Sequence, residues 1–142
     1  MSLSPIDLKE FTRFQQNEIT ESIVYDHLAA IEKDPSNRKV LQLISAQEKA
    51  HYHTLKKYTL TDTRPNRWRI AKYYWLARVL GITFAIKLME SREENAHNNY
   101  SRYTDCEDLQ RLSREEEEHE EKLVELINEE RLEYMGSVVL GL

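Results

Sequence analysis

The chain has 142 residues and a mass of 16.9 kDa, which is the size of one domain. Hydrophobic residues make up 40% and are enough for a core, whereas three Gly and three Pro are too few for the turns of a β-sandwich or barrel. The net charge of −5 argues against a nucleic-acid binder, and the single cysteine excludes an intrachain disulfide or a CxxC site. With no signal-peptide pattern and no apolar run of about 20 residues, we expect a soluble, cytoplasmic, all-α domain.

Cap and proline signals divide the chain into long helices. Ser4-Pro5 and Asp34-Pro35 each place a capping residue before a proline, which needs no N–H donor in the first helical turn. A polar connection at 59–66 follows the second helix, and Gly81 marks a point where the third helix bends or breaks. The predicted helices are about 5–33, 35–58, 65–103 and 105–134. This pattern predicts a four-helix bundle with a long crossover between its second and third helices.

The inward face of each predicted helix is apolar at its ends and polar in its middle. Positions spaced alternately three and four residues apart face the core of a bundle. In the second helix these positions are Leu41, Ile44, Glu48, His51, Leu55 and Tyr58, and in the last they are Leu109, Leu112, Glu116, His119, Leu123 and Leu126. The first and third helices carry Glu18 with Glu21, and Glu90 with Glu93, at the corresponding middle positions.

These polar residues predict a metal centre. Stacked in a bundle, six carboxylates and two imidazoles meet at one level of an apolar core, and burying them ionised without a counter-charge is very costly. Two bound cations remove that cost, because a Glu and a His three residues apart lie on one face of a helix and can reach the same metal. Carboxylate and imidazole ligands without thiolate favour iron or manganese over structural zinc. The alternative is a solvated acidic face, since 115–118 is an unbroken glutamate run, but the shared register of the two Glu-x-x-His pairs favours the metal.

At these residues the chain resembles a ferritin-like, rubrerythrin-type (erythrin) domain. The family pattern is matched by Glu18, Glu48 with His51, Glu90, and Glu116 with His119, and the extra glutamates of the more symmetric erythrins are matched by Glu21 and Glu93. The segments 15–25, 81–94 and 114–136 are more narrowly similar to erythrin domains fused in front of vacuolar iron transporter family membrane proteins. The chain lacks the rubredoxin cysteines of classical rubrerythrin, so a peroxide reductase of this type would need an external reductant.

The resemblance implies a di-iron protein, with manganese as the other candidate metal, that binds Fe(II) and oxidises it with O2 or H2O2. It implies the iron-handling module of a membrane iron or manganese transporter, at the cytosolic face of a membrane. The alternatives are a peroxide-reducing enzyme and a non-catalytic helical interaction domain. Tyr25 and Tyr100 lie near the polar layer and could hydrogen-bond ligands or carry an oxidising equivalent, although core aromatics are the simpler interpretation. His97 is similarly interpreted as a core histidine or a neighbour of the ligands.

Two segments fall outside the predicted centre. Residues 64–87 carry six basic side chains and no acid, and within 64–78 the cations alternate with aromatics. This composition suits a homodimer or other protein contact, ranked slightly first, or an anionic membrane surface. We assign 1–134 to the di-iron domain and 135–142 to an apolar tail, which is either an ordinary terminus or the start of a truncated membrane helix.

Overall fold

The computed structural model describes the backbone of residues 2–140 and their side chains, except those of Glu90, 92–98 and 127–140. All regular structure in the described residues is helical, which confirms the all-α prediction. The helices are α1 (Pro5–Ile31), α2 (Pro35–Thr59), α3 (Arg67–Leu80), α4 (Ile82–Ser101) and α5 (Glu107–Leu140).

The first two helices begin where the capping signals predict. The Ser4 hydroxyl accepts a hydrogen bond from the Asp7 amide, while the Asp7 carboxylate accepts one from the Ser4 amide, which completes a capping box. The Asp34 carboxylate accepts from two amides in the first turn of α2, and a proline follows each cap. These local interactions fix the starts of α1 and α2 without help from the rest of the fold.

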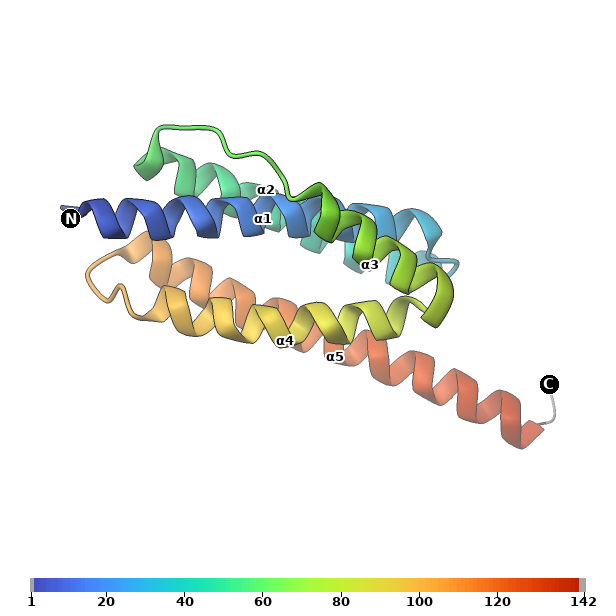
Figure 1. The fold of residues 1–142 in the computed structure, drawn as a ribbon. Coiled ribbons are helices and arrows are strands. Elements are labelled where there is room, and N and C mark those ends of the chain that lie inside the picture. Colours follow the sequence, from blue (N-terminus) through green and yellow to red (C-terminus); the bar gives the residue numbers. More distant parts are fainter. Residues whose placement is uncertain (1, 141–142) are drawn as a thin grey trace.

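The predicted third helix, 65–103, is two helices that meet at Gly81. This residue has φ of 98° and ψ of 155°, a conformation that L side chains rarely adopt, and it ends α3 and begins α4. A Cβ built there meets nothing within 4 Å, so the backbone angle, rather than crowding, requires glycine. The chain reverses at this point, and α4 runs back beside α5 (Figure 1).

The helices pack as two pairs, α1 with α2 and α4 with α5, and α3 packs against both α1 and α4 (Figure 1). The connection from α2 and the short α3 together link the two pairs. The last helix continues to Leu140 instead of ending near residue 134, and it extends past the other helices (Figure 1). Residues 141–142 of the predicted tail lie outside the described part. None of the helices, over the described residues, has the length and apolarity to cross a bilayer.

Two apolar clusters form the core, and a polar layer separates them along the helices. One cluster includes Leu28, Leu41 and Leu123, and the other includes Phe14, Leu55 and Leu112. On α1, α2 and α5, the sequence passes from one cluster to the other through buried glutamate or histidine. On these three helices the middle of the apolar stripe is therefore polar and buried, as the sequence predicts.

Candidate metal centre

Four buried residues converge in the polar layer: Glu18 from α1, Glu48 and His51 from α2, and Glu116 from α5. One ligand atom from each lies within 4.8 Å of all the others, so this group could hold a metal ion. Each residue is at most 2% exposed. The i, i+3 spacing in α2 places Glu48 and His51 on the same face, and both face α5. These four predicted ligands therefore meet in the core and not on separate surfaces.

The two Glu-x-x-His pairs are crossed. His51 Nδ1 lies 3.0 Å from Glu116 Oε1, and His119 Nδ1 lies 2.8 Å from Glu48 Oε1. The two imidazole rings stack with centroids 5.7 Å apart and an interplanar angle of 21°. Each histidine thus directs Nδ1 at the glutamate of the opposite helix, which places His119 in the same centre.

The other ring nitrogens face partners on the outer side of the centre. His51 Nε2 donates to Glu115 Oε2 over 2.5 Å, and His119 Nε2 donates to Gln47 Oε1. In both cases the acceptor immediately precedes the glutamate of the opposite motif, so the two halves use the same geometry. A hydrogen bond at Nε2 fixes the ring orientation and directs Nδ1 inward, which is how metal-binding histidines are commonly held.

The two histidines of the centre differ in protonation state. Although burial lowers the pKa of His51, its hydrogen bond to Glu116 and the charge of Glu18, whose Oε2 lies 3.5 Å from Nδ1, raise that pKa to about 11, so Nδ1–H donates to Glu116. Burial and the nearby His51 charge lower the pKa of His119 to about 4. With Nε2–H used by Gln47, the neutral His119 presents a lone pair at Nδ1, which accepts from a protonated Glu48.

The carboxyl groups do not share one charge state. Burial, followed by the charges of Glu116 and Glu18, raises the pKa of Glu48 well above its ordinary value. Burial and the Glu18 charge raise the pKa of Glu116 to about 7. Burial also opposes ionisation of Glu18, but the adjacent Glu48 carboxyl and the charged His51 ring, whose Nδ1 lies 3.5 Å from Glu18 Oε2, outweigh it and lower its pKa to about 2. Low solvation and mutual repulsion therefore keep protons on carboxyl groups that would be ionised in water.

Three carboxyl oxygens of this centre are buried without a hydrogen-bond partner among the described residues. They are Oε2 of Glu18, Oε2 of Glu48 and Oε2 of Glu116. A buried acceptor left unpaired costs about 1–3 kcal/mol, more when it carries charge. Unpaired carboxylate oxygens beside inward-facing imidazole nitrogens are the donor set of a metal site. The residues present therefore fit a hard divalent or trivalent cation.

The predicted supplementary glutamate Glu21 lies at the edge of the centre and has a cation beside it. Burial and the charges of Glu18 and Glu116 raise its pKa, while Arg69 opposes the shift. Arg69 Nη2 lies 3.7 Å from Glu21 Oε1, and its Nη1 donates to Asn17 Oδ1. The sequence analysis placed Arg69 only in the basic surface tract, whereas the structure turns it toward the core. Charge compensation by Arg69 distinguishes Glu21 from the four clustered residues.

Both predicted tyrosines are buried. The Tyr100 hydroxyl donates to Glu18 Oε1, so this tyrosine holds a predicted ligand. Tyr25 belongs to the apolar cluster with Leu28 and Leu41, and its part in the centre stays a prediction. The side chains of Glu90, Glu93 and His97 lie outside the described residues, so their part in the centre stays a prediction.

Sequence analysis missed two further residues at the centre, Glu115 and Gln47. In the sequence Glu115 belongs to the glutamate run 115–118, which suggests a solvated face, yet this side chain is only 32% exposed and accepts from His51. Aligning the two Glu-x-x-His motifs would have shown that Glu115 and Gln47 have equivalent roles, because each immediately precedes the glutamate of its motif.

Comparison with known proteins gives no further assignment. No family model, curated protein or solved structure matches this chain.

Proposed function

We propose that this chain is a ferritin-like four-helix bundle, with 60–80 as its crossover, whose di-iron centre binds Fe(II) and oxidises it. The observation that carries the proposal is the buried group of Glu18, Glu48, His51 and Glu116, with unpaired oxygens directed into it. Manganese fits the same donor set. Two bound ferrous ions supply two electrons, so one H2O2 and two protons give two ferric ions and two waters.

The side chains prepare the centre for cations in three ways. Glu115 and Gln47 orient the two imidazole rings. Neutral His119 already directs a lone pair at Nδ1 into the centre, and His51 does so once its Nδ1 proton leaves. Tyr100 occupies Glu18 Oε1 and leaves Oε2 for a ligand bond. The apolar clusters above and below exclude water, which strengthens each charge interaction inside. Glu90 and Glu93 are proposed to complete the ligand set from α4.

The cellular setting is proposed from the sequence resemblance. An iron-oxidising domain at the cytosolic face of a membrane would deliver iron to a fused or neighbouring transporter. In that setting the domain acts on iron as a cargo, and rapid electron supply from a reductase is not required. The alternative erythrin enzyme would need that supply in order to reduce peroxide repeatedly.

Metal analysis of protein purified without chelator tests the centre itself. We expect two iron or manganese ions per chain, with a large loss in Glu48→Ala and in Glu116→Ala. Glu120→Ala is the matched control, because Glu120 lies on the same helix as Glu116 but outside the cluster. Metal-free protein, or equal loss in all three variants, refutes the proposal and leaves a helical interaction domain.

Stopped-flow mixing separates iron handling from peroxide reduction. We expect the Fe(II) form to be oxidised rapidly by O2 or H2O2 and to be reduced again slowly. Fast, repeated peroxide turnover driven by NAD(P)H through an added reductase would contradict iron handling and identify the enzyme. The ferric absorbance follows both half-reactions in the same cell.

A further inference from the structure

The outer face of α3 is an exposed apolar stripe. Trp68 is 80% exposed, Trp75 63% and Val79 75%, and the spacing of seven and four residues places all three on one side of the helix. The opposite side is buried in the core through Tyr73 and Ala77. A soluble helix usually exposes polar side chains on its outer face, so this stripe requires an explanation.

Exposed cations flank this stripe along α3. Lys72 lies between the two tryptophans along the helix, and Arg67 and Arg78 flank them; all three are exposed. The whole segment 64–87 has no acidic residue in a chain whose net charge is −5. Because Arg69 turns toward Glu21, the remaining cations are those that face outward. The surface thus combines apolar and positive groups in a molecule that is otherwise acidic.

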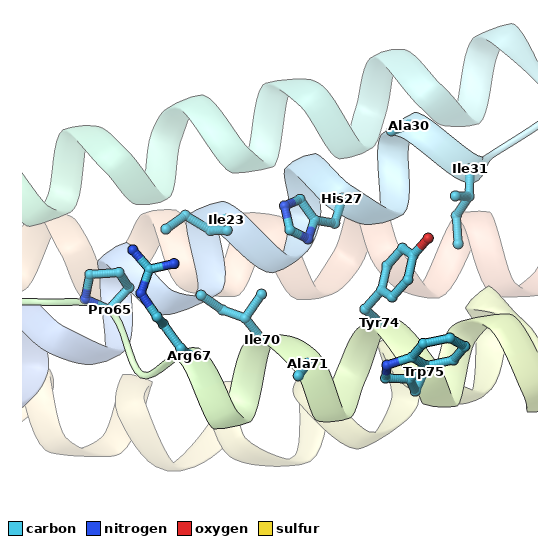
Figure 2. A pocket seen from close by; sticks show the side chains of 10 residues that line it. All are labelled: Ile23, His27, Ala30, Ile31, Pro65, Arg67, Ile70, Ala71, Tyr74 and Trp75. Atoms are coloured by element: carbon cyan, nitrogen blue, oxygen red, sulfur yellow. The ribbon is translucent and has the colours of Figure 1, made fainter.

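A groove adjoins the stripe between α3 and α1 (Figure 2). It has a volume of about 580 Å³, and Ile23 and Ile70 contribute apolar side chains to its lining. Arg67 lies at one end of the groove, while Trp75 lies toward the other (Figure 2). The groove extends the apolar surface of α3 and keeps a cation at its margin.

The charges decide between a second copy and a lipid surface. A symmetric dimer through α3 would place the same patch on both sides, so Arg67, Lys72 and Arg78 would face like charges. An anionic bilayer instead offers phosphates for the cations and an interfacial zone in which tryptophan is favoured. The alternation of tryptophan with exposed Lys and Arg matches an interfacial helix.

We propose that the outer face of α3 binds the surface of anionic membranes. Trp68, Trp75 and Val79 enter the boundary between headgroups and acyl chains, with α3 lying parallel to the membrane plane. Lys72, Arg67 and Arg78 contact lipid phosphates. The centre in the core stays away from the lipid, because the buried side of α3 separates it from this face.

Intrinsic fluorescence gives a direct test, because the chain has two tryptophans and both lie on the stripe. Full-length protein is mixed with vesicles of phosphatidylcholine containing 30% phosphatidylserine, or with phosphatidylcholine alone. We expect a blue shift and cosedimentation with the anionic vesicles only, and quenching by lipids brominated in the acyl chain. No binding to anionic vesicles, or binding without a blue shift, overturns the proposal.

Charge-reversal variants provide the matched comparison. Lys72→Glu with Arg78→Glu is expected to weaken vesicle binding by at least about 30-fold, since the loss of each cation near an anionic surface costs about fivefold and each introduced glutamate adds repulsion. Lys39→Glu, an exposed residue on α2, is expected to change binding by less than twofold. Equal weakening by Lys39→Glu would show a general charge effect and refute the assignment to α3.

Self-association is measured on the same proteins by sedimentation velocity. A dimer that dissociates in Lys72→Glu with Arg78→Glu, together with no lipid binding by the parent protein, assigns the stripe to a second copy and overturns the proposal. Unchanged circular dichroism and metal content in the variants exclude a folding defect.

Discussion

Metal binding should release protons in an amount that the buried centre specifies. At pH 7 the proton on His51, whose pKa is raised to about 11, is present before metal binds. Glu116, with its pKa raised to about 7, carries about half a proton, whereas Glu18 is already ionised. His51 and Glu116 should therefore release about 1.5 protons per chain when cations replace them, and the proton that the raised pKa of Glu48 favours adds to this number.

The number of protons released on metal binding should fall as the pH rises. At pH 5 Glu116 is fully protonated, so its contribution to the release should rise to about one proton, and at pH 9 that contribution should fall to nearly zero. Isothermal titration calorimetry with Mn²⁺ in buffers of different ionisation enthalpy measures the number directly. Mn²⁺ is used because it binds carboxylates and imidazoles without oxidation in air at neutral pH.

Two controls separate this number from general charge effects. Glu116→Gln removes the carboxyl group that carries about half a proton at pH 7. If this variant still binds Mn²⁺ weakly, the number of protons released should no longer change between pH 5 and pH 9. Glu120→Ala should leave both the number and its pH dependence unchanged. If the parent protein binds metal without releasing protons, the crossed hydrogen bonds do not hold the protons as described, and the reasoning fails.

Three further predictions follow from the same contacts. Glu115→Ala should weaken metal binding by about 10–100-fold because His51 loses the acceptor that orients it, whereas Glu118→Ala should not; equal effects in a Mn²⁺ titration would refute this orienting role. The metal-free protein should lose stability to urea as pH rises from 6.5 towards 11, because a raised pKa of His51 stabilises the fold only while the proton is bound; unchanged stability across that range would contradict it. Gly81→Ala should lower the free energy of unfolding by about 1 kcal/mol or more because φ is 98°, and an unchanged urea midpoint would count against the strain.

The helix starts and the polar layer were predictable because both depend on short sequence spacings. Ser4 and Asp34 act on amides two or three residues away, so their capping role is visible in the sequence. The Glu-x-x-His spacing fixes which side of α2 and α5 is polar, whatever the rest of the fold does. The apolar residues on either side of each motif then place that polar side in the core.

The break at Gly81 and the position of Arg69 depend on contacts between distant segments, which periodicity does not contain. A glycine in a helical pattern is compatible with continuation, a bend or a reversal, and packing of α3 on both α1 and α4 selects the reversal. Arg69 lies in a basic tract, but Glu21 and Asn17 of α1 draw it inward. Only the three-dimensional arrangement separates this internal cation from the exposed ones.

The two halves of the centre are equivalent in geometry but not in charge. His51 is backed by the carboxylate of Glu115, whereas His119 is backed by the neutral amide of Gln47. A carboxylate makes the imidazole it accepts from a stronger electron donor, whereas His51 must also lose the proton that its raised pKa holds, so the cation positions at His51 and at His119 should differ in affinity. Stepwise Mn²⁺ binding should then show two unequal affinities in the parent protein. Gln47→Glu should bring the two affinities together, and two equal affinities in the parent would contradict this asymmetry.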